Sequence, residues 1–383
     1  MSDEQSKLLL LGVGGGGGRL VAAVRARYQG DMRVLCMDTD ALANREVQRD
    51  ADIPCILFGA RRLSGNGAGG APSLGLEAFN DDAAILDDHL QGVRTAVVLT
   101  CLGGGTGSGA TPEIARVLNS KGISTLCVVT CPFAFEGKER QDIASRVCSQ
   151  IEDHVDSRME VNLDDLFDET GVGNAAQANE AANTLLASGV TLLWHLVTRP
   201  GFVCADAARL NGLIARGGSV RFGSVSASGD NRVARLTESL RGSRLLQGRE
   251  TLSKANAILV GILGGDDLRL SELGDIMKTL RSWCNEDCHV EMGTVLDAEF
   301  DGRIELVVFA FENWAIQGAS EPPIVDPFLI PNKPGKRGKK PTASKLSHGA
   351  TGRGKFQNVE PTMWSTGDLD IPTYLRRNIR LER

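Results

Sequence analysis

Short apolar runs alternate with longer helical patterns through the first half of the chain. Most of the runs lead into glycine-rich or polar residues, and then into a stretch in which apolar residues recur every three or four positions. This alternation predicts an α/β fold, with a doubly wound parallel sheet that binds its ligand at the carboxyl ends of the strands. The apolar runs are residues 8–11, 32–37, 56–58, 97–99 and 126–129.

The second half of the chain opens with one long helix. Residues 175–198 carry a continuous helical pattern, and the sequence Arg-Pro-Gly at 199–201 ends it. Strand-like runs then return between about residues 202 and 312, where we expect a second, smaller α/β unit. These runs are residues 220–225, 257–261 and 304–311.

The composition changes again after residue 312. Between Asp326 and Glu360 there is no acidic residue, and lysine and arginine accumulate among proline, glycine and serine. Such a segment buries too little apolar surface to fold, so we expect a disordered basic linker over residues 313–364. An amphipathic pattern returns in residues 369–377.

The overall composition is that of a globular cytoplasmic protein. The 383 residues are 42% hydrophobic, enough for two domains and a tail. No run of about 18 apolar residues and no secretory signal is evident, so we expect no membrane span. The formal net charge of −6 argues against nucleic-acid binding.

The nine cysteines are odd in number and scattered, which favours reduced core thiols over disulfides. Cys284, Cys288 and His289 are neighbours in the sequence, but no second pair of ligands accompanies them. We therefore expect no metal site in the protein itself.

The glycine-rich heptapeptide at residues 103–109 is the most informative motif. It joins the apolar run 96–100 to a helical pattern at 110–118, and a glycine turn at a helix N-terminus binds phosphate through bare backbone N–H groups. No lysine follows it, so it is not the P-loop of other nucleotide-binding proteins. The negative charge of the phosphates must therefore be stabilised by backbone N–H groups, hydroxyls and Mg²⁺. The candidate ligands are Gly103, Gly104, Gly105, Thr106, Gly107, Ser108 and Gly109.

Two further glycine loops are expected at the same edge of the sheet. Residues 12–18 satisfy the dinucleotide pattern GxGxxG, with Asp38 and Asp40 where a ribose-binding acid belongs, so a dehydrogenase is an alternative. A dinucleotide site has one phosphate-binding turn, however, whereas residues 65–72 add another glycine loop. Three converging loops favour a nucleoside triphosphate.

The heptapeptide resembles the signature of the tubulin/FtsZ superfamily of GTPases. The similarity to bacterial FtsZ extends over most of residues 7–312 and resumes in residues 369–383. It implies a Rossmann-like parallel-sheet GTPase domain, a long core helix, a second smaller α/β domain and a disordered tail. The implied boundaries are a flexible N-terminus (1–6), the GTP-binding domain (7–174), the core helix and linker (175–201), the C-terminal activation domain (202–312), the basic linker (313–364) and a tether-binding peptide (365–383).

The resemblance also implies a set of nucleotide contacts. The first loop would pass under the α and β phosphates, and Arg19 replaces the asparagine that ends this loop in the family. The stretch 132–140 resembles the family's PFxFEGxxR motif, although Glu136 and Arg140 could equally form a solvated pair four residues apart on a helix. Asn183 falls at the base-reading position, unless it is a solvated amide. The implied contacts are Gly15, Gly16, Gly17, Gly18, Arg19, Asp40, Ala68, Gly69, Gly70, Glu136, Arg140 and Asn183.

In this family the next subunit of a filament completes the catalytic site. Its loop carries the pattern N-x-D-x-x-D after Arg-Pro-Gly, and two carboxylates orient the attacking water. Here Asp206 matches the first carboxylate, Cys204 replaces the asparagine and Arg209 replaces the second carboxylate. A guanidinium is donor-only and cannot act as the base, so hydrolysis is expected to be slow unless Asp206 suffices.

The end of the chain resembles the peptide by which FtsZ docks onto membrane tethers. Ile371, Tyr374 and Leu375 form an apolar face for a groove, and the arginines beside them could also touch anionic lipid. The residues implied in partner binding are Asp370, Ile371, Pro372, Tyr374, Leu375 and Arg376.

These features predict a cytoplasmic protein that binds GTP or GDP with Mg²⁺, polymerises head to tail and builds a bacterial division ring on the inner face of the membrane. Its expected partners are copies of itself and a membrane tether, with no direct contact to nucleic acid. One alternative is a non-hydrolysing paralogue that caps or copolymerises with a competent FtsZ, which Arg209 favours. A filament that positions plasmid DNA is a further alternative, but it would not need the tether peptide.

Overall fold

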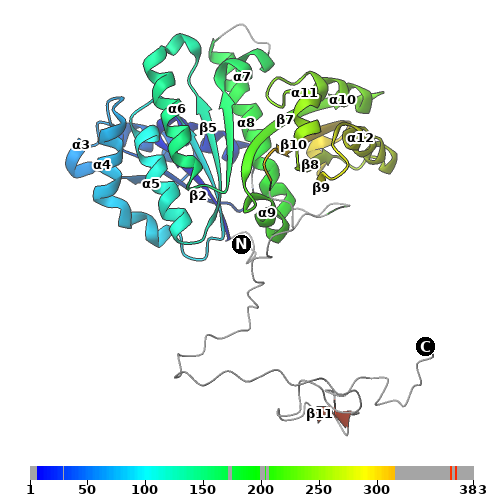
Figure 1. Cartoon of the computed structure of the whole chain (residues 1–383), viewed down its shortest axis with the longest axis horizontal. Helices are drawn as coiled ribbons and strands as arrows, with labels where there is room; N and C mark the ends of the chain where they lie inside the picture. The colour runs from blue at the N-terminus through cyan, green and yellow to red at the C-terminus, as the bar shows by residue number, and fades with distance from the viewer. Residues whose placement is uncertain are drawn as a thin grey trace, which may run out of the picture. The chain divides into compact units, whose positions relative to one another are not determined.

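Ten strands form one continuous sheet (Figure 1) in the order β3-β2-β1-β4-β5-β6-β7-β10-β8-β9. The computed structural model describes residues 7–28, 30–170, 175–198, 203, 207–314, 363–364 and 367–368. The strands are β1 Leu8–Val13, β2 Arg33–Asp38, β3 Cys55–Leu57, β4 Thr95–Cys101, β5 Ser124–Cys131, β6 Ser157–Asn162, β7 Gly218–Ser228, β8 Ala257–Gly264, β9 His289–Leu296 and β10 Arg303–Phe311.

The first six strands are parallel to their neighbours and are covered on both faces. Because side chains alternate along a strand, Leu8 and Leu10 enter one core while Leu9 and Leu11 enter the other. Burial on both faces explains why these strands appear in the sequence as continuous apolar runs. The predicted α/β class with a parallel sheet is confirmed.

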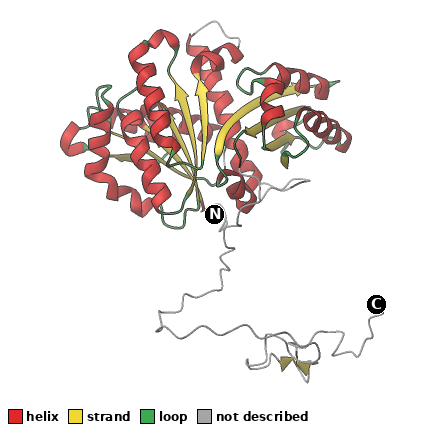
Figure 2. Ribbon diagram, in the orientation of Figure 1, coloured by secondary structure: helices red, strands yellow, loops and turns green. Residues whose placement is uncertain are grey.

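Helices cover both faces of this half of the sheet (Figure 2). Buried side chains of α4, α5 and α6 share one core, and those of α1, α2, α7 and the following helix α8 share the other. The helices are α1 Gly14–Arg27, α2 Ala41–Ala51, α3 Ala60–Leu63, α4 Pro72–Asp82, α5 Thr106–Ser120, α6 Lys138–Glu152 and α7 Leu163–Thr170, with 3₁₀ turns η2 Ala83–His89 and η3 Ala134–Glu136.

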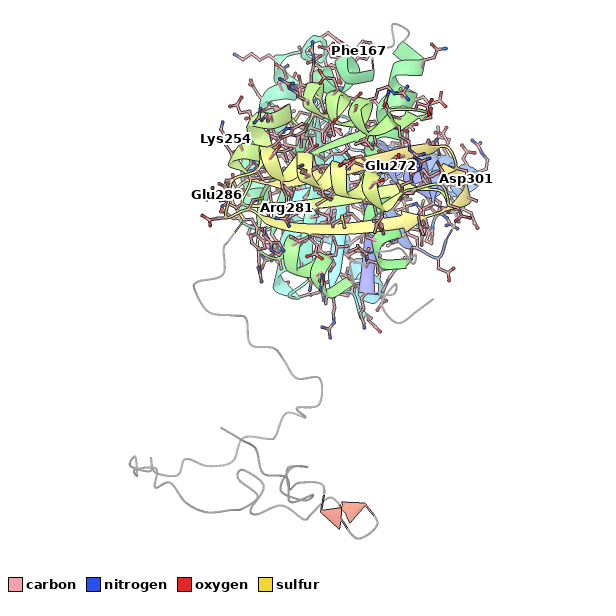
Figure 3. All side chains as sticks on the ribbon, turned by 90° about the vertical axis from the view of Figure 1, so that its right-hand side faces the viewer. Phe167, Lys254, Glu272, Arg281, Glu286 and Asp301 are labelled. Carbon is pink, nitrogen blue, oxygen red and sulfur yellow. The ribbon has the colours of Figure 1, made fainter. Side chains whose placement is uncertain are left out.

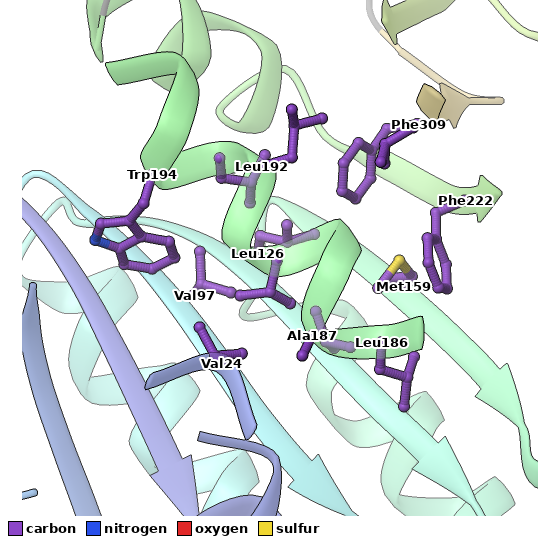
Figure 4. Packing of buried hydrophobic residues seen from close by; sticks show 14 of the residues in the cluster. Val24, Val97, Leu126, Met159, Leu186, Ala187, Leu192, Trp194, Phe222 and Phe309 are labelled. Atoms are coloured by element: carbon purple, nitrogen blue, oxygen red, sulfur yellow. The ribbon is translucent and has the colours of Figure 1, made fainter. Parts of the chain in front are cut away.

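The long core helix is α8, Ala175–Thr198. Figure 4 shows its side chains packed between residues of the first half of the sheet and residues of the second half. The segment Glu180–Thr198 is long and apolar enough to cross a membrane, but 67% of it is buried inside the protein, as in a core helix. The predicted core helix over residues 175–198 is therefore confirmed. The labelled side chains of α8 are Leu186, Ala187, Leu192 and Trp194.

The second half continues the same sheet. Strand β7 runs parallel to β6 and antiparallel to β10, which lies antiparallel to β8. One sheet therefore passes through both predicted domains. Charged side chains such as Lys254, Arg281 and Glu286 project outward from this half (Figure 3). Its helices are α9 Ala207–Ile214, α10 Arg232–Gly242, α11 Gly248–Lys254, α12 Leu270–Trp283 and the turn η4 Ala298–Phe300.

A partly buried ion pair joins the two halves. The guanidinium of Arg27 on α1 donates to both carboxylate oxygens of Glu305 on β10, at 2.7 and 2.6 Å. The side chain of Glu305 is only 7% exposed. Removing one partner of such a pair leaves an uncompensated charge and is destabilising. This contact therefore stabilises the packing of the two halves.

Residues 1–320 and 321–383 form two separate units. In the second unit, β11 (Met363–Trp364) pairs antiparallel with β12 (Gly367–Asp368). The predicted flexible N-terminus, most of the basic linker and the tether residues 370–376 lie outside the described residues, as does Asp206.

Candidate nucleotide site

A cavity of about 380 Å³ lies at the carboxyl ends of β1, β4 and β5. The N-termini of α1 and α5 both open into it, as the sequence pattern predicts for this edge of the sheet. Its lining residues are Gly14, Gly15, Gly16, Arg19, Leu20, Cys101, Leu102, Gly104, Gly105, Thr106, Gly107, Thr130, Pro132, Phe133, Glu136, Arg140, Leu163, Asn183 and Leu186.

The first glycine loop is largely the first turn of a helix. Helix α1 begins at Gly14, whose φ of +71° is unfavourable for any other residue, and no side chain caps it. The free N–H groups at its start therefore face the cavity. A Cβ at Gly16 would clash with the Cys101 side chain, and a Cβ at Gly17 would clash with the backbone oxygen of Leu99.

The last two glycines of the run have a packing role, unlike Gly14, Gly15 and Gly16, which line the cavity. Gly17 and Gly18 do not line the cavity; they let α1 approach β4 and the Val47 side chain of α2. Their direct contact with phosphate stays a prediction.

The third glycine loop presents an open position to the cavity. Gly103 has φ +91°, and its N–H donates to the Ser108 hydroxyl at 2.9 Å, which closes the turn before α5. A Cβ built on Gly104 would meet no atom within 4 Å, so the space beside it is free for a ligand. The position of Gly105 is closely packed instead, because a Cβ there would lie 2.8 Å from the Cβ of Ala68. Gly109 packs against α4 and lies outside the lining.

The second glycine loop packs against the third loop and does not line the cavity. Asp40, Ala68, Gly69 and Gly70 do not line the cavity. The Asp40 carboxylate caps α2 by accepting from the N–H of Leu42 at 2.8 Å, while its backbone pairs with Asn66. These four residues are not brought to the cavity, and their nucleotide contacts stay a prediction.

Hydroxyls and a buried acid join the loops. Thr39 and Thr106 hydroxyls lie 2.6 Å apart, which ties the end of β2 to the start of α5. Burial raises the pKa of the neighbouring Asp38 carboxyl, although the N–H groups of Asp40 and Thr39 donate to it and act in the opposite direction.

Charged residues follow β5. The Glu136 carboxylate accepts from the N–H of Phe133 at 3.0 Å and pairs with the Arg140 guanidinium at 2.6 Å. Both proposed roles of this pair are therefore compatible with the geometry, since it is an i,i+4 pair that also lines the cavity. Arg19 lines the cavity too, so two arginines face the space where phosphates would lie.

The opposite wall is more apolar. Asn183 lies on α8 beside Leu186, and both line the cavity with Leu163 and the ring of Phe133, which stacks on Phe135 at 4.8 Å. An amide among apolar side chains suits a purine base. Sequence reasoning missed Gly14, Leu20, Cys101, Leu102, Thr130, Pro132, Phe133, Leu163 and Leu186, although their positions at strand ends and helix starts could have indicated them.

The cavity fits a nucleoside triphosphate carrying its own Mg²⁺. Backbone N–H groups from two helix starts, hydroxyls and two arginines converge on one space, and helix N-termini favour anions. Among the described residues that line the cavity, Glu136 is the one with a carboxylate, and this carboxylate is already paired with Arg140. A magnesium ion would therefore be held mainly by phosphate oxygens.

The predicted catalytic position lies far from this cavity. Arg209 is in the first turn of α9, which follows the far end of α8 (Figure 1). From Asn183 to Thr198, α8 rises about 22 Å. The Arg209 guanidinium pairs with the Glu291 carboxylate of β9 at 2.8 Å; the Arg209 side chain is 60% exposed and that of Glu291 is 12% exposed. A guanidinium, held by a carboxylate, thus occupies the position that the sequence predicts to be catalytic.

This fold and cavity define an α/β nucleotide-binding protein with a sheet shared by two halves. The model of the Tubulin/FtsZ family GTPase domain matches residues 7–170, and that of the FtsZ family C-terminal domain matches residues 218–312. The chain belongs to the tubulin/FtsZ family of GTPases. The resemblance of the sequence to this family is therefore confirmed.

Individual relatives agree over most of the chain. Cell division protein FtsZ of Buchnera aphidicola subsp. Schizaphis graminum is 34% identical over 310 residues, 80% of this chain and 79% of the relative. That of Coxiella burnetii is 30% identical over 391 residues, 98% and 97%. The solved empty FtsZ dimer of M. jannaschii superposes with a TM-score of 0.74 at 25% identity, over 80% of this chain and 88% of that one.

Proposed function

We propose that this protein is a bacterial division-ring GTPase that binds GTP or GDP, with Mg²⁺, in the cavity between α1, α5 and α8. The observation that carries the proposal is the convergence of two uncapped helix starts, built from glycine, on one cavity that also contains Arg19 and Arg140. Phosphates are stabilised at such positions by backbone N–H groups and by the helix dipoles.

Each end of the nucleotide has a proposed partner. The glycines at 14–16 and 104–107 bind the phosphates, and Arg19 and Arg140 add positive charge. Glu136 lies on the ribose side, and Asn183 reads the guanine edge by hydrogen bonds that adenine could not make in the same way. Apolar side chains around Asn183 exclude water from the base.

Hydrolysis is proposed to take place between subunits. Arg209 follows the end of α8 that is remote from its own cavity, so a catalytic group in this part of the chain can act only on the nucleotide of a neighbouring molecule. Head-to-tail assembly brings this end against the next cavity, and the FtsZ of M. jannaschii was solved as a dimer. Asp206, which is outside the described residues, would orient the attacking water.

Arg209 is proposed to slow this reaction. Its pairing with Glu291 holds a positive charge where the family pattern has a carboxylate. A guanidinium can stabilise phosphate charge but cannot accept a proton from water. The same feature favours the second candidate function, a non-hydrolysing paralogue that binds GTP and caps or copolymerises with a competent FtsZ.

One paired measurement separates these functions. GTP turnover and light scattering are followed together on the full chain. Assembly in GTP with slow turnover supports the division-ring GTPase, whereas GTP binding without assembly supports a capping paralogue. Absence of GTP binding contradicts both.

The tail gives a separate prediction. We propose that residues 370–376 dock onto a membrane tether, which places the filaments at the cytoplasmic face of the division site. Deleting residues 366–383 should leave light scattering in GTP unchanged and abolish recruitment to the division site, because the apolar docking face is gone. A matched variant, with the substitutions Ile371→Ser, Tyr374→Ser and Leu375→Ser, removes the apolar face and retains the arginines. Normal localisation of this variant would show that charge, and not the apolar face, recruits the protein.

A further inference from the structure

Two thiols and a carboxylate lie together between β5, β6 and α6, and none of the three lines the nucleotide cavity. Cys131 is the last residue of β5, Cys148 lies on α6 and Glu160 on β6. Their sulfur and oxygen atoms all lie within 4.8 Å of one another. Cys148 is buried, Cys131 is half-buried and Glu160 is exposed, so the group connects the core with solvent.

The topology explains why these residues meet. Along β5 the side chain of Thr130 faces the nucleotide cavity, so Cys131 points to the other face, which α6 covers. Strand β6 runs parallel beside β5 with Glu160 opposite Val129, so Glu160 lies on the same face as Cys131. Helix α6 supplies Cys148 from above this face.

We propose that Cys131, Cys148 and Glu160 form a binding site for a thiophilic divalent cation of the Zn²⁺ class, with water as the fourth ligand. Two sulfurs and one carboxylate oxygen are a suitable set for tetrahedral zinc, and three protein ligands with an open position leave room for water. At Zn–S distances of about 2.3 Å, two sulfur ligands are about 3.8 Å apart. The observed separations therefore require only small side-chain rotations.

The charges around the group suit a divalent cation. Two thiolates and one carboxylate carry three negative charges, and the Arg158 guanidinium lies 3.8 Å from the Glu160 carboxylate. The two positive charges of a divalent cation and the single charge of Arg158 together balance the three negative charges of the ligands. The Arg158 guanidinium also donates to the backbone oxygen of Cys148 at 2.7 Å, which keeps its positive charge beside that thiol.

The two thiols are hydrogen-bonded to each other. The hydrogen bond from Cys131 lowers the pKa of the Cys148 thiol, and the same contact raises that of Cys131. A thiol binds a metal ion as the thiolate, so metal binding should release protons and strengthen as pH rises.

Among the described residues, the other thiol pairs lack a third ligand of this kind. Cys36 and Cys55 lie opposite each other in neighbouring strands, and no described carboxylate or imidazole completes a ligand group with them. Cys284 is hydrogen-bonded to Cys288, but the ring of His289 stacks on Trp314 at 5.1 Å. Cys284 is half-buried like Cys131, which makes it the matched control.

The test is a titration of the full chain with Co²⁺ in a phosphine reductant that keeps all thiols reduced. We expect one equivalent to give the intense visible bands of tetrahedral cobalt with thiolate charge transfer, and Zn²⁺ but not Mg²⁺ to remove them, since Mg²⁺ prefers oxygen ligands. Cys131→Ser should bind at least about 100-fold more weakly, because even loss of an outer-shell partner costs 10–100-fold. Glu160→Gln should weaken binding and retain the thiolate band.

The control decides the location. Cys284→Ser should bind Co²⁺ like the wild type, and equal binding by Cys131→Ser and Cys284→Ser would overturn the proposal, as would a wild type without tetrahedral bands. Circular dichroism before titration verifies that the variants are folded, and Glu160 is exposed enough for Glu160→Gln to be tolerated. GTP binding is measured in parallel; it should be the same in all three variants, so failure of the metal site is distinct from failure of the nucleotide site.

Discussion

Replacing Arg209 with aspartate should raise GTP turnover by about 10²-fold or more, because a positioned general base contributes about 10²–10⁴-fold. The substitution restores the second carboxylate of the family pattern, which can accept a hydrogen bond from the attacking water, whereas the guanidinium cannot. Filaments followed by light scattering should then disassemble sooner after GTP is added.

The partner of Arg209 must be changed as well. The Glu291 side chain is only 12% exposed and pairs with Arg209 at 2.8 Å, so a new aspartate would face an unpaired carboxylate. The double variant Arg209→Asp/Glu291→Gln removes this repulsion and should give the larger increase. Arg249→Asp, at an exposed position in the first turn of α11, makes the same charge change away from this loop and should leave turnover unchanged.

Two outcomes would contradict this account. If the native protein already hydrolyses GTP rapidly and neither Arg209 variant changes the rate, another carboxylate orients the water. If Asp206→Ala retains the residual turnover, the alignment of this loop with the family pattern is wrong. GTP affinity should be unaffected in both variants, because the loop serves the neighbouring subunit's nucleotide.

Replacing Gly104 with leucine should abolish GTP binding while leaving the protein folded. A Cβ at this position meets no protein atom within 4 Å, so the new side chain enters the cavity and displaces phosphate. Hydrogen bonds to charged groups contribute about 1.5–3 kcal/mol each. Loss of two would weaken binding by about 10²-fold or more, as measured by equilibrium binding of a fluorescent GTP analogue.

Two other glycines make the result interpretable. Gly274 in α12 is exposed and equally open, so Gly274→Leu should bind GTP normally. Gly105→Ser should also lose binding, but through displacement of the second glycine loop, since its Cβ would lie 2.8 Å from that of Ala68 and 2.9 Å from the backbone nitrogen of Ala71. The thermal unfolding midpoint of Gly105→Ser should fall, whereas that of Gly104→Leu should stay unchanged. Unchanged GTP affinity in Gly104→Leu is the result that would remove the cavity assignment.

Local sequence patterns are sufficient to predict the parallel strands, the helix at Ala175–Thr198 and the glycine loop before α5. These features are local: an apolar run buried on both faces, a 3.6-residue period and bare backbone at a helix start are each visible in a few adjacent residues. For the same reason the motif at 103–109 was sufficient to identify the family and the edge of the sheet that carries the cavity.

Which residues of each motif line the cavity depends on the packing of the whole fold. Gly16 lines the cavity while Gly17 packs on β4, because a glycine needed for close approach looks in sequence like one needed for phosphate. The continuity of the sheet from β6 to β7, the pairing of Arg209 with Glu291 and the meeting of two cysteines with Glu160 all join residues far apart in the chain. No local pattern encodes such contacts, since they depend on how strands and helices pack against one another.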